Sequence, residues 1–315
     1  METDSLLLTT SQAAGLLGVH ESSMKRWANE GRLRLSKTDG GHRRILLEDL
    51  LAFARLERSD SPLLLLAPHE HEMAAAALAC RERNHYQPLA ELIIRLCDTR
   101  SPGYLLAVMK YLQVNCGIPL ARTFDLGISE AMRRIGNEWA SGSRTIAHEH
   151  RFTQKMLDAI HALRGVEPSS LQRQSPLALV GCAETCYHEV GAMFVRYLLE
   201  EAGWQTCYLG ANVPFSEYAS IQGDLGARLV AISFVPPCGN PEARRGVGIL
   251  AGLYRESAPY YLALGGGGLE PGALRSMGSP FLALKVEKDT ESFQIWARGK
   301  AREKGRAAGK ARGNA

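Results

Sequence analysis

Hydrophobic and polar positions follow three different patterns along the chain. Residues 1–58 form short, charged amphipathic stretches, and residues 69–166 have helical periodicity with few β-branched runs. After a polar break at Glu167–Pro176, short apolar runs alternate with amphipathic stretches. Those runs are Leu177–Gly181, Gln205–Gly210, Leu229–Val235 and Tyr260–Leu264. This alternation predicts a parallel sheet with helical crossovers.

The breaks between these patterns predict a multidomain protein that combines α and α/β domains. A Ser/Pro-rich stretch, Ser59–Pro68, separates the first pattern from the second. We expect a small domain at residues 1–58, a helical domain at 69–166, an α/β domain at 174–297 and a basic tail at 298–315.

The positive charge of the chain is concentrated in that tail. From Arg298 onwards there are seven Lys or Arg residues and one acid, Glu303, so the tail carries +6. The whole chain carries +4, which leaves −2 for the remainder. With almost no apolar bulk to bury, the tail is predicted to be disordered. It is suited either to electrostatic contact with nucleic acid or to a solubilising role.

Composition predicts a folded cytoplasmic protein without a membrane segment. Apolar residues make up 45% and charged residues 22%, values typical of soluble globular domains. The N-terminus lacks the basic start of a signal peptide, and the longest Leu run, Leu63–Leu66, is too short to cross a bilayer. The seven cysteines are scattered without a CxxC pair, which predicts free thiols in a reducing compartment.

The first domain has the order of elements of a winged helix-turn-helix. One helix opens at Thr10–Ala14 and ends at Gly18, and a second runs from His20 to Gly31. The N-terminal part of the second helix carries the side chains expected to meet bases and phosphates, namely Ser22, Ser23, Lys25 and Arg26. Gly40 and Gly41 then permit a hairpin, followed by a basic wing of His42, Arg43 and Arg44, and a third helix starts at Glu48–Phe53. Trp27 is expected in the core.

The segments QAAGLLGVHESSMKRWANEGRL and TDGGHRRILLEDLLAF resemble the MerR-type winged helix-turn-helix family. The resemblance implies that residues 8–56 bind a double-stranded DNA operator. The alternative is a small helical domain whose arginines are only surface charge. The long dimerisation helix usual in that family does not follow, so dimer contacts must arise elsewhere.

The α/β segment carries a candidate cofactor loop, Gly181–Gly191, after its first expected strand. Ligands of open α/β sheets bind at the carboxyl ends of strands, so His188 is expected to be exposed there and able to coordinate a metal. Ser233–Val235 and Gly265–Gly268 follow the third and fourth strands. Glycines at such a position let a bulky group lie against the backbone.

This constellation resembles the cobalamin-binding domain, a Rossmann-like fold. The matching residues are Cys186, His188 and Gly191 for the acid-x-His-x-x-Gly loop, Ser233 and Val235 for the turn, and Gly265 and Gly266 for the glycine pair. The resemblance implies that His188 is the lower cobalt ligand. Cys186 replaces an acid that orients the histidine in the family. The alternatives are a helix-capping His188, or zinc bound by Cys182, Cys186 and His188, which lacks a clear fourth ligand.

The middle segment contains Trp139 and, after nine intervening residues, Glu149 and His150. This spacing resembles the Trp-x9-Glu-His signature of CarH/LitR-type photoreceptor repressors, which join a MerR-type domain, a four-helix bundle and a cobalamin domain in this order. The resemblance implies adenosylcobalamin bound between the bundle and the α/β domain, with Trp139 over its upper face and the Glu-His pair near the adenosyl group. Ala140 stands where light-sensing members commonly have a histidine. The alternative is a core tryptophan with a solvated Glu-His pair.

These resemblances predict a cobalamin-dependent, light-responsive transcriptional repressor and not an enzyme. Adenosylcobalamin would promote assembly into a homo-oligomer, a dimer or tetramer, and thereby raise DNA affinity. Two alternatives remain open. The loop with Cys182, Cys186 and His188 could bind haem or another tetrapyrrole in a redox or gas sensor. A helical bundle with a cobalamin domain could also be the corrinoid methyl-carrier module of a methyltransferase.

Overall fold

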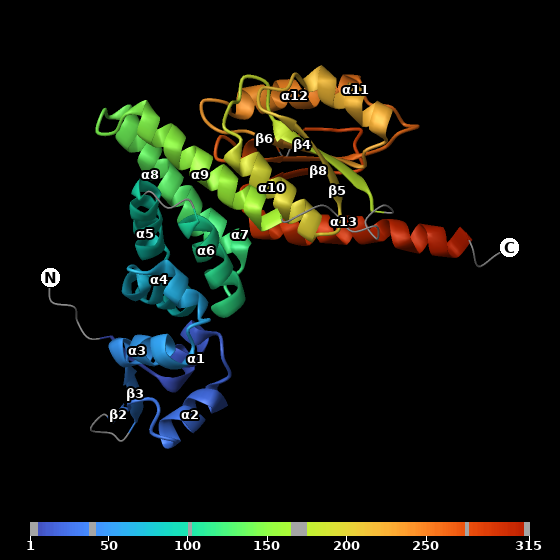
Figure 1. Cartoon of the computed structure of the whole chain (residues 1–315). Helices are drawn as coiled ribbons and strands as arrows, with labels where there is room; N and C mark the ends of the chain where they lie inside the picture. The colour runs from blue at the N-terminus through green and yellow to red at the C-terminus, as the bar shows by residue number, and fades with distance from the viewer. Residues whose placement is uncertain (1–5, 38–41, 100–102, 165–174, 275–276, 312–315) are drawn as a thin grey trace. The chain divides into compact units, whose positions relative to one another are not determined.

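The structure is a computed structural model that describes residues 6–37, 42–99, 103–164, 175–274 and 277–311 (Figure 1). It divides into two compact units, Met1–Ala159 and Ile160–Ala315. The first unit contains the small N-terminal domain and most of the helical segment. The second contains the α/β domain. Each unit is described by itself.

The N-terminal domain has the predicted helix-turn-helix and wing. Its elements are β1 (Leu7–Leu8), α1 (Thr10–Leu17), α2 (Glu21–Asn29), β2 (Ser36–Lys37), β3 (Arg43–Leu46) and α3 (Leu47–Glu57). The three strands pair antiparallel in the order β1-β3-β2. The predicted turn at Gly40 and Gly41 lies outside the described residues. Strand β1 has only two residues and was not predicted, because so short a segment has no periodicity to detect.

Local sequence determines where these helices start and stop. Thr9 caps α1. Its hydroxyl accepts a hydrogen bond from the Gln12 backbone amide, and the Gln12 side-chain oxygen accepts one from the Thr9 backbone amide. Gly18 ends the helix in the left-handed conformation at φ 65°. Trp27 is 7% exposed, with its ring centroid 4.9 Å from that of Phe53. The prediction that Trp27 belongs to the core is confirmed.

The helical segment begins with a short 3-10 turn and includes two π-helical stretches. Its elements are η1 (Pro62–Leu66), α4 (Glu70–Arg83), α5 (Gln87–Asp98), α6 (Tyr104–Lys110), η2 (Tyr111–Asn115), α7 (Leu120–Arg122), η3 (Thr123–Ile128), α8 (Ser129–Ala140) and α9 (Ile146–Arg164). The π-helical stretches are η2 and η3. The amphipathic helix α5 turns Leu89, Leu92, Ile93 and Leu96 into the core.

The N-terminal domain packs directly on this helical segment within the first unit. The buried Tyr111 hydroxyl donates to the Leu16 carbonyl oxygen over 2.9 Å, in the last turn of α1. Arg55 of α3 bonds the buried Glu70 carboxylate of α4 over 3.0 Å. A buried carboxylate without its partner is costly, so this ion pair links the two segments firmly.

The second unit is a three-layer α/β domain. Its elements are β4 (Leu177–Cys182), α10 (Val190–Glu201), β5 (Gln205–Gly210), α11 (Phe215–Leu225), β6 (Leu229–Ser233), α12 (Asn240–Gly252), β7 (Tyr261–Gly265), η5 (Pro271–Leu274), β8 (Leu284–Glu287) and α13 (Thr290–Ala311). All strands are parallel in the order β5-β4-β6-β7-β8. Helices α10 and α13 cover one face and α11 and α12 the other (Figure 1).

Four strands were predicted and the described sheet has a fifth, β8. Its sequence, Leu-Lys-Val-Glu, is half-buried at every position and carries two charges, which pair with each other. An edge strand needs less apolar sequence than a central one, because its outer side faces solvent. The apolar-run criterion therefore missed it.

The prediction of a disordered tail from Arg298 is wrong as far as Ala311, because α13 continues to that residue. Low hydrophobicity predicts that a segment cannot bury surface, but Ala, Lys and Arg have high helix propensity. The first part of the helix is also held on the folded domain, because the Trp204 indole donates to the Ala297 carbonyl over 2.9 Å. Residues 312–315 lie outside the described part.

We expect Gly266→Ala to lower the stability of the α/β domain by about 1–3 kcal/mol, the range for a strained backbone position. Gly266 has φ +111°, and a Cβ there would lie 2.2 Å from the Phe234 carbonyl oxygen. The matched control is Gly267→Ala, where the nearest neighbour is a Pro236 carbon at 4.0 Å. Calorimetric unfolding of both variants measures the difference. Equal losses would contradict the assignment.

Candidate DNA interface and cofactor site

The recognition helix α2 separates its core face from its DNA face by helical periodicity. Met24 and Trp27 are buried, whereas Ser22, Lys25 and Arg26 are exposed. Ser23 is half-buried. Lys25 forms an exposed ion pair with Glu21 over 2.9 Å, and its hydrogen bond lowers the pKa of Glu21. DNA phosphates would compete with Glu21 for this lysine.

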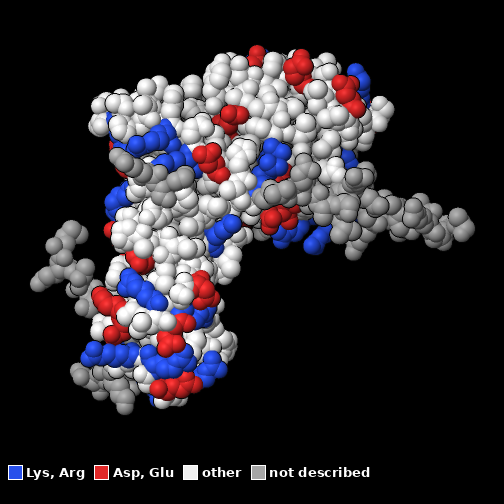
Figure 2. All heavy atoms as spheres, in the orientation of Figure 1, with Lys and Arg blue, Asp and Glu red and all other residues white. Residues whose placement is uncertain are grey.

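The wing is bonded to the end of the recognition helix. The Arg43 guanidinium donates to the Asn29 side-chain oxygen over 3.2 Å, and Arg43 pairs with Lys37 across the hairpin ladder. His42 and Arg43 are exposed and Arg44 is half-buried. The structure therefore brings wing and recognition helix together as one surface, although acids are intermixed with bases over the visible face of this domain (Figure 2).

The cofactor loop of the second unit lies where the strand order reverses. Strands β4 and β6 are neighbours in the sheet, but their following helices α10 and α12 lie on opposite faces. The loops after these strands therefore diverge at the carboxyl edge, the usual ligand position in such sheets. His188 is exposed on the loop after β4, and Ser233 ends β6 directly opposite Cys182.

Two motif residues that are distant in sequence face each other here. A Cβ on Gly191, in the first turn of α10, would lie 3.5 Å from the Ser233 hydroxyl. Ser233 is almost fully buried, and Val235 is half-buried just beyond it. The predicted HxxG and Ser-x-Val motifs therefore share one edge of the sheet. A glycine at position 191 lets the first turn of α10 lie close to the end of β6.

The glycine pair is packed closely against the chain's own backbone. The Phe234 carbonyl oxygen lies where a Cβ on Gly266 would be. A Cβ on Gly265 would lie 3.0 Å from the Glu287 carbonyl oxygen. The bulky neighbour expected at Gly266 is the chain's own backbone. This glycine is explained by packing of the β7 loop onto the end of β6, with or without a ligand.

The buried thiols of the loop hold its backbone in place. The Cys182 thiol lies 3.5 Å from the His188 carbonyl oxygen, and the Cys186 sulfur lies 3.9 Å from that of Val235. The hydrogen bond between the two thiols lowers the pKa of Cys186 and raises that of Cys182. Cys186 is 1% exposed, so it shapes the loop from inside while His188 faces outwards.

The neighbouring loop clamps the same segment from the other side. The Asn212 amide donates to the Cys186 carbonyl over 2.8 Å, and its side chain accepts from the Thr185 amide over 2.8 Å. Both Thr185 and Asn212 have positive φ. Sequence reasoning missed Asn212, although an Asn after a strand is a known signal for such a turn.

Neither acid beside the histidine is free to replace the family's usual carboxylate. The Tyr208 hydroxyl donates to Glu189 over 3.0 Å, and Arg245 bonds Glu184 over 2.7 Å. These partners come from β5 and α12, so local sequence could not reveal them.

The residues predicted on the helical segment lie near the α8–α9 turn, where Trp139 and His150 are exposed and Glu149 is half-buried. Trp139 is 47% exposed, which rules out the alternative of a core tryptophan. Glu149 accepts from the Thr153 hydroxyl over 2.9 Å and lies 3.6 Å from the His150 ring nitrogen. Exposed aromatic surface of this size is available to a ligand or partner.

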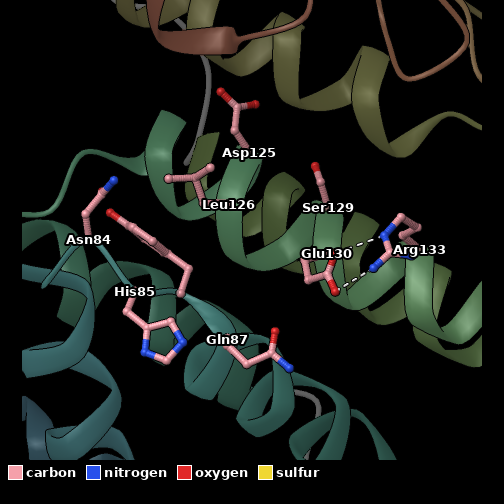
Figure 3. Close-up of a pocket in the computed structure, with 9 residues that line it drawn as sticks. Asn84, His85, Gln87, Asp125, Leu126, Ser129, Glu130 and Arg133 are labelled. Carbon is pink, nitrogen blue, oxygen red and sulfur yellow. Dashed lines mark hydrogen bonds and ion pairs between the residues drawn. The ribbon is translucent and has the colours of Figure 1, made fainter.

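A separate hollow of about 500 Å³ lies elsewhere on the helical segment. Figure 3 shows Glu130 and Arg133 paired on one side of it, with His85 and Gln87 on the other. Trp139 is nine residues beyond Glu130, about 13 Å along the axis of α8. None of the predicted site residues lines this hollow.

No group of three or more His, Cys, Asp or Glu side chains in the described ranges could hold a metal ion. Within the same ranges, no helix is long and apolar enough to span a membrane.

Comparison with known proteins agrees with the N-terminal geometry. Residues 7–55 match the model of the helix-turn-helix domain family. This segment is a helix-turn-helix domain. The match includes α1, α2, the wing strand and most of α3. The helix-turn-helix domain therefore contains the surface formed by α2 and the wing.

Similarity to known proteins also extends beyond the helix-turn-helix domain. The chain is 24% identical over 232 residues to the HTH-type transcriptional repressor CarH of Myxococcus xanthus, covering 70% of this chain and 74% of that protein. It is 24% identical over 148 residues to dimethylamine corrinoid protein 1 of Methanosarcina mazei, covering 47% and 66%. The solved monomethylamine corrinoid protein of Methanosarcina barkeri aligns at TM-score 0.49 and 16% identity, covering 67% and 96%.

We expect Arg44→Ala to weaken binding to all DNA sequences and to reduce the dependence of log affinity on log salt by about one unit. The matched control is Arg32→Ala in the same domain, because Arg32 is already paired with Glu30 and Glu57 at 3.1 and 2.6 Å. Fluorescence anisotropy with a labelled duplex at several salt concentrations measures both slopes. An unchanged slope for Arg44→Ala would exclude the wing from phosphate contact.

Proposed function

We propose that the chain is a DNA-binding transcriptional repressor that binds adenosylcobalamin through His188 and responds to light. One observation carries the cofactor assignment: an exposed imidazole follows β4 at the reversal of strand order, with Gly191 and Ser233 facing each other beside it. The regulatory part is supported by the helix-turn-helix domain and by the similarity to CarH.

The residues at this edge fit a corrinoid. His188 is exposed and can approach a metal from the protein side, while Cys186 and Asn212 hold its loop from within. Gly191 and Ser233 are small residues that face each other at this edge, and we assign them to the nucleotide tail of the cofactor. The bound cofactor would supply a light-sensitive cobalt–carbon bond. The protein would supply the lower ligand.

The same proposal assigns Trp139, Glu149 and His150 to the adenosyl group. The exposed face of Trp139 is suited to stacking, and Glu149 and His150 provide polar groups beside it. Loss of the adenosyl group in light would remove this contact, lower the preference for the assembled homo-oligomer and reduce DNA affinity. Ala140 has no coordinating atom, so no ligand from that position would stabilise the product.

A corrinoid methyl carrier is one alternative, because dimethylamine corrinoid protein 1 is among the similar proteins. The helix-turn-helix domain favours regulation, since a methyl carrier has no use for it. Haem is disfavoured by the burial of Cys182 and Cys186, whose sulfurs face the protein interior. A visible spectrum after reconstitution distinguishes haem from corrinoid.

We expect His188→Ala to abolish coordination below the corrin. The sharpest probe is adenosylcobinamide, which lacks the nucleotide base, so an imidazole-bound visible spectrum can arise only from a protein ligand. The wild-type chain should show that spectrum, and the variant should bind more weakly and show the spectrum of adenosylcobinamide without an imidazole ligand. The matched control is His161→Ala, the other histidine of the second unit, also exposed. An imidazole-bound spectrum in His188→Ala would refute the assignment.

Trp139→Ala should weaken binding of adenosylcobalamin more than binding of hydroxocobalamin. A stacking aromatic contributes only when the adenosyl group is present, by about 0.5–1.5 kcal/mol. The control is Leu126→Ala, which removes another exposed apolar side chain, 43% exposed, from the same helical segment. Titrations, with gel filtration and DNA binding before and after green light, measure these effects. Equal losses for both cobalamins would exclude a role at the adenosyl group.

A further inference from the structure

The turn between α8 and α9 carries Trp139 at its start and has little buried surface of its own. Within the described range 139–148, every residue is exposed except Arg144, which is half-buried. The backbone closes the turn locally, because the Ser143 and Arg144 amides donate to the Glu138 carbonyl over 2.8 and 3.1 Å. Such local bonds define the shape of a turn but do not fix its position on the rest of the domain.

The side chain of Arg144 connects this turn to the end of another helix. Its guanidinium bonds both carboxylate oxygens of Asp98, the last residue of α5, at 3.0 and 3.1 Å. It also donates to the carboxylate of Glu138, the residue before Trp139 in α8. The planar guanidinium presents several fixed donors, so it can hold two acids at once better than the single ammonium of a lysine. One side chain thus joins the turn, the end of α8 and the end of α5.

Asp98 is a suitable anchor because its own position requires positive partners. It ends α5, where the helix dipole disfavours a negative charge. Arg144 and Arg151 both bond it, Arg151 over 3.3 Å. Lys155 donates to the Cys97 carbonyl over 2.8 Å, an acceptor that has no partner within the helix. The end of α5 is therefore a common anchor for the turn and for helix α9.

These contacts act on the part of the chain from which the Trp139 ring projects. The Arg144 side chain is 21% exposed and makes three hydrogen bonds, unlike a fully exposed ion pair, which holds a turn weakly. An aromatic ring stacks on a ligand only within a narrow range of distances and orientations. Ordering its backbone in advance reduces the entropy that is lost on binding.

We propose that Arg144 is a positioning residue that holds Trp139 where it can distinguish adenosylcobalamin from cobalamins without the adenosyl group. The inference rests on the proposed assignment of Trp139 to that group. Arg144 acts through the turn and not by contact with the cofactor. Of the described residues 139–148, it is the one that both avoids solvent and bonds another helix.

The test measures the affinities of the full chain for adenosylcobalamin and hydroxocobalamin in the dark and takes their ratio. Partial unfolding lowers both affinities by the same factor, so the ratio separates positioning from stability. Arg144→Gln should lower the ratio by about 2- to 10-fold, because the stacking of one aromatic ring contributes no more than that. Asp98→Asn weakens the same link from α5 and should lower the ratio too.

The matched control is Arg95→Gln. Arg95 also links α5 to another helix, since it bonds Glu72 of α4 over 2.7 Å, but it does not contact the turn. The control should leave the ratio unchanged. An equal fall in the ratio for Arg95→Gln and Arg144→Gln would overturn the proposal, because any loss of a link between helices would then have the same effect.

A second readout needs no cofactor. Hydrogen exchange at the amides of residues 143 and 144 reports how often the turn opens in the cofactor-free chain. Exchange there should be faster in Arg144→Gln and unchanged in Arg95→Gln. Unchanged exchange in Arg144→Gln would show that the turn is held without this side chain, which would overturn the proposal.

A double variant shows whether Arg144 acts through Trp139. Once Trp139→Ala has removed the ring, Arg144→Gln should lower the ratio no further, since coupled residues give non-additive effects. Additive losses would overturn the proposal. A ratio that falls in Trp139→Ala but not in Arg144→Gln would overturn this inference alone. A ratio unchanged in Trp139→Ala would overturn the assignment of Trp139 to the adenosyl group, and this inference with it.

Discussion

The pairing of β4 with β6 in the middle of the parallel sheet is the constraint on which the candidate cofactor site depends. The register runs from Ala178 opposite Leu229 to Cys182 opposite Ser233, and the β6 residues are all buried. Because both strands run in the same direction, their loops leave the same edge. Because their helices cover opposite faces, those loops separate at that edge. The loop that carries His188 and the end of β6 at Ser233 therefore lie at the same edge of the sheet.

Around this edge, backbone carbonyl groups pack closely against glycines and buried thiols. Carbonyl oxygens of Phe234 and Cys238 lie so close to Gly266 and Gly268 that no side chain fits at either glycine. The thiols of Cys182 and Cys186 are buried against further carbonyls. A rigid loop with an exposed imidazole at its tip suits metal ligation, since a ligand held in place loses little entropy on binding.

Exposed ion pairs neutralise much of the charge on the helix-turn-helix domain. The helix-turn-helix domain intermixes acids and bases, so its lysine and arginine side chains already have partners such as Glu21, Glu30 and Glu57. Exchange of such exposed partners for phosphates costs little, because surface ion pairs contribute at most about 1 kcal/mol. The net positive charge of the sequence lies in residues 298–315, which carry seven Lys or Arg and one acid.

Much of this architecture could be predicted from the sequence, because local signals determine it. The Thr9 cap and Gly18 stop define α1, four of the strands follow from their apolar runs, and the crossover pattern predicts a parallel sheet. Candidate residues could be named for the same reason, since motifs such as Cys186-x-His188-x-x-Gly191 are contiguous. Edge strand β8 escaped, because its charged residues resemble loop sequence.

Only the tertiary structure decided which residues distant in sequence contact each other. Glu189 is engaged by Tyr208, Cys186 is buried beneath the histidine loop, and Gly266 is required by Phe234. Trp139 has a large apolar side chain of the kind usually found in a core, but it is half-exposed. The sequence by itself determined which elements form and which chemical groups they carry, because capping, periodicity and strand length act over a few residues. The partners of those groups were decided by strand order and packing, which bring together segments that no local pattern relates.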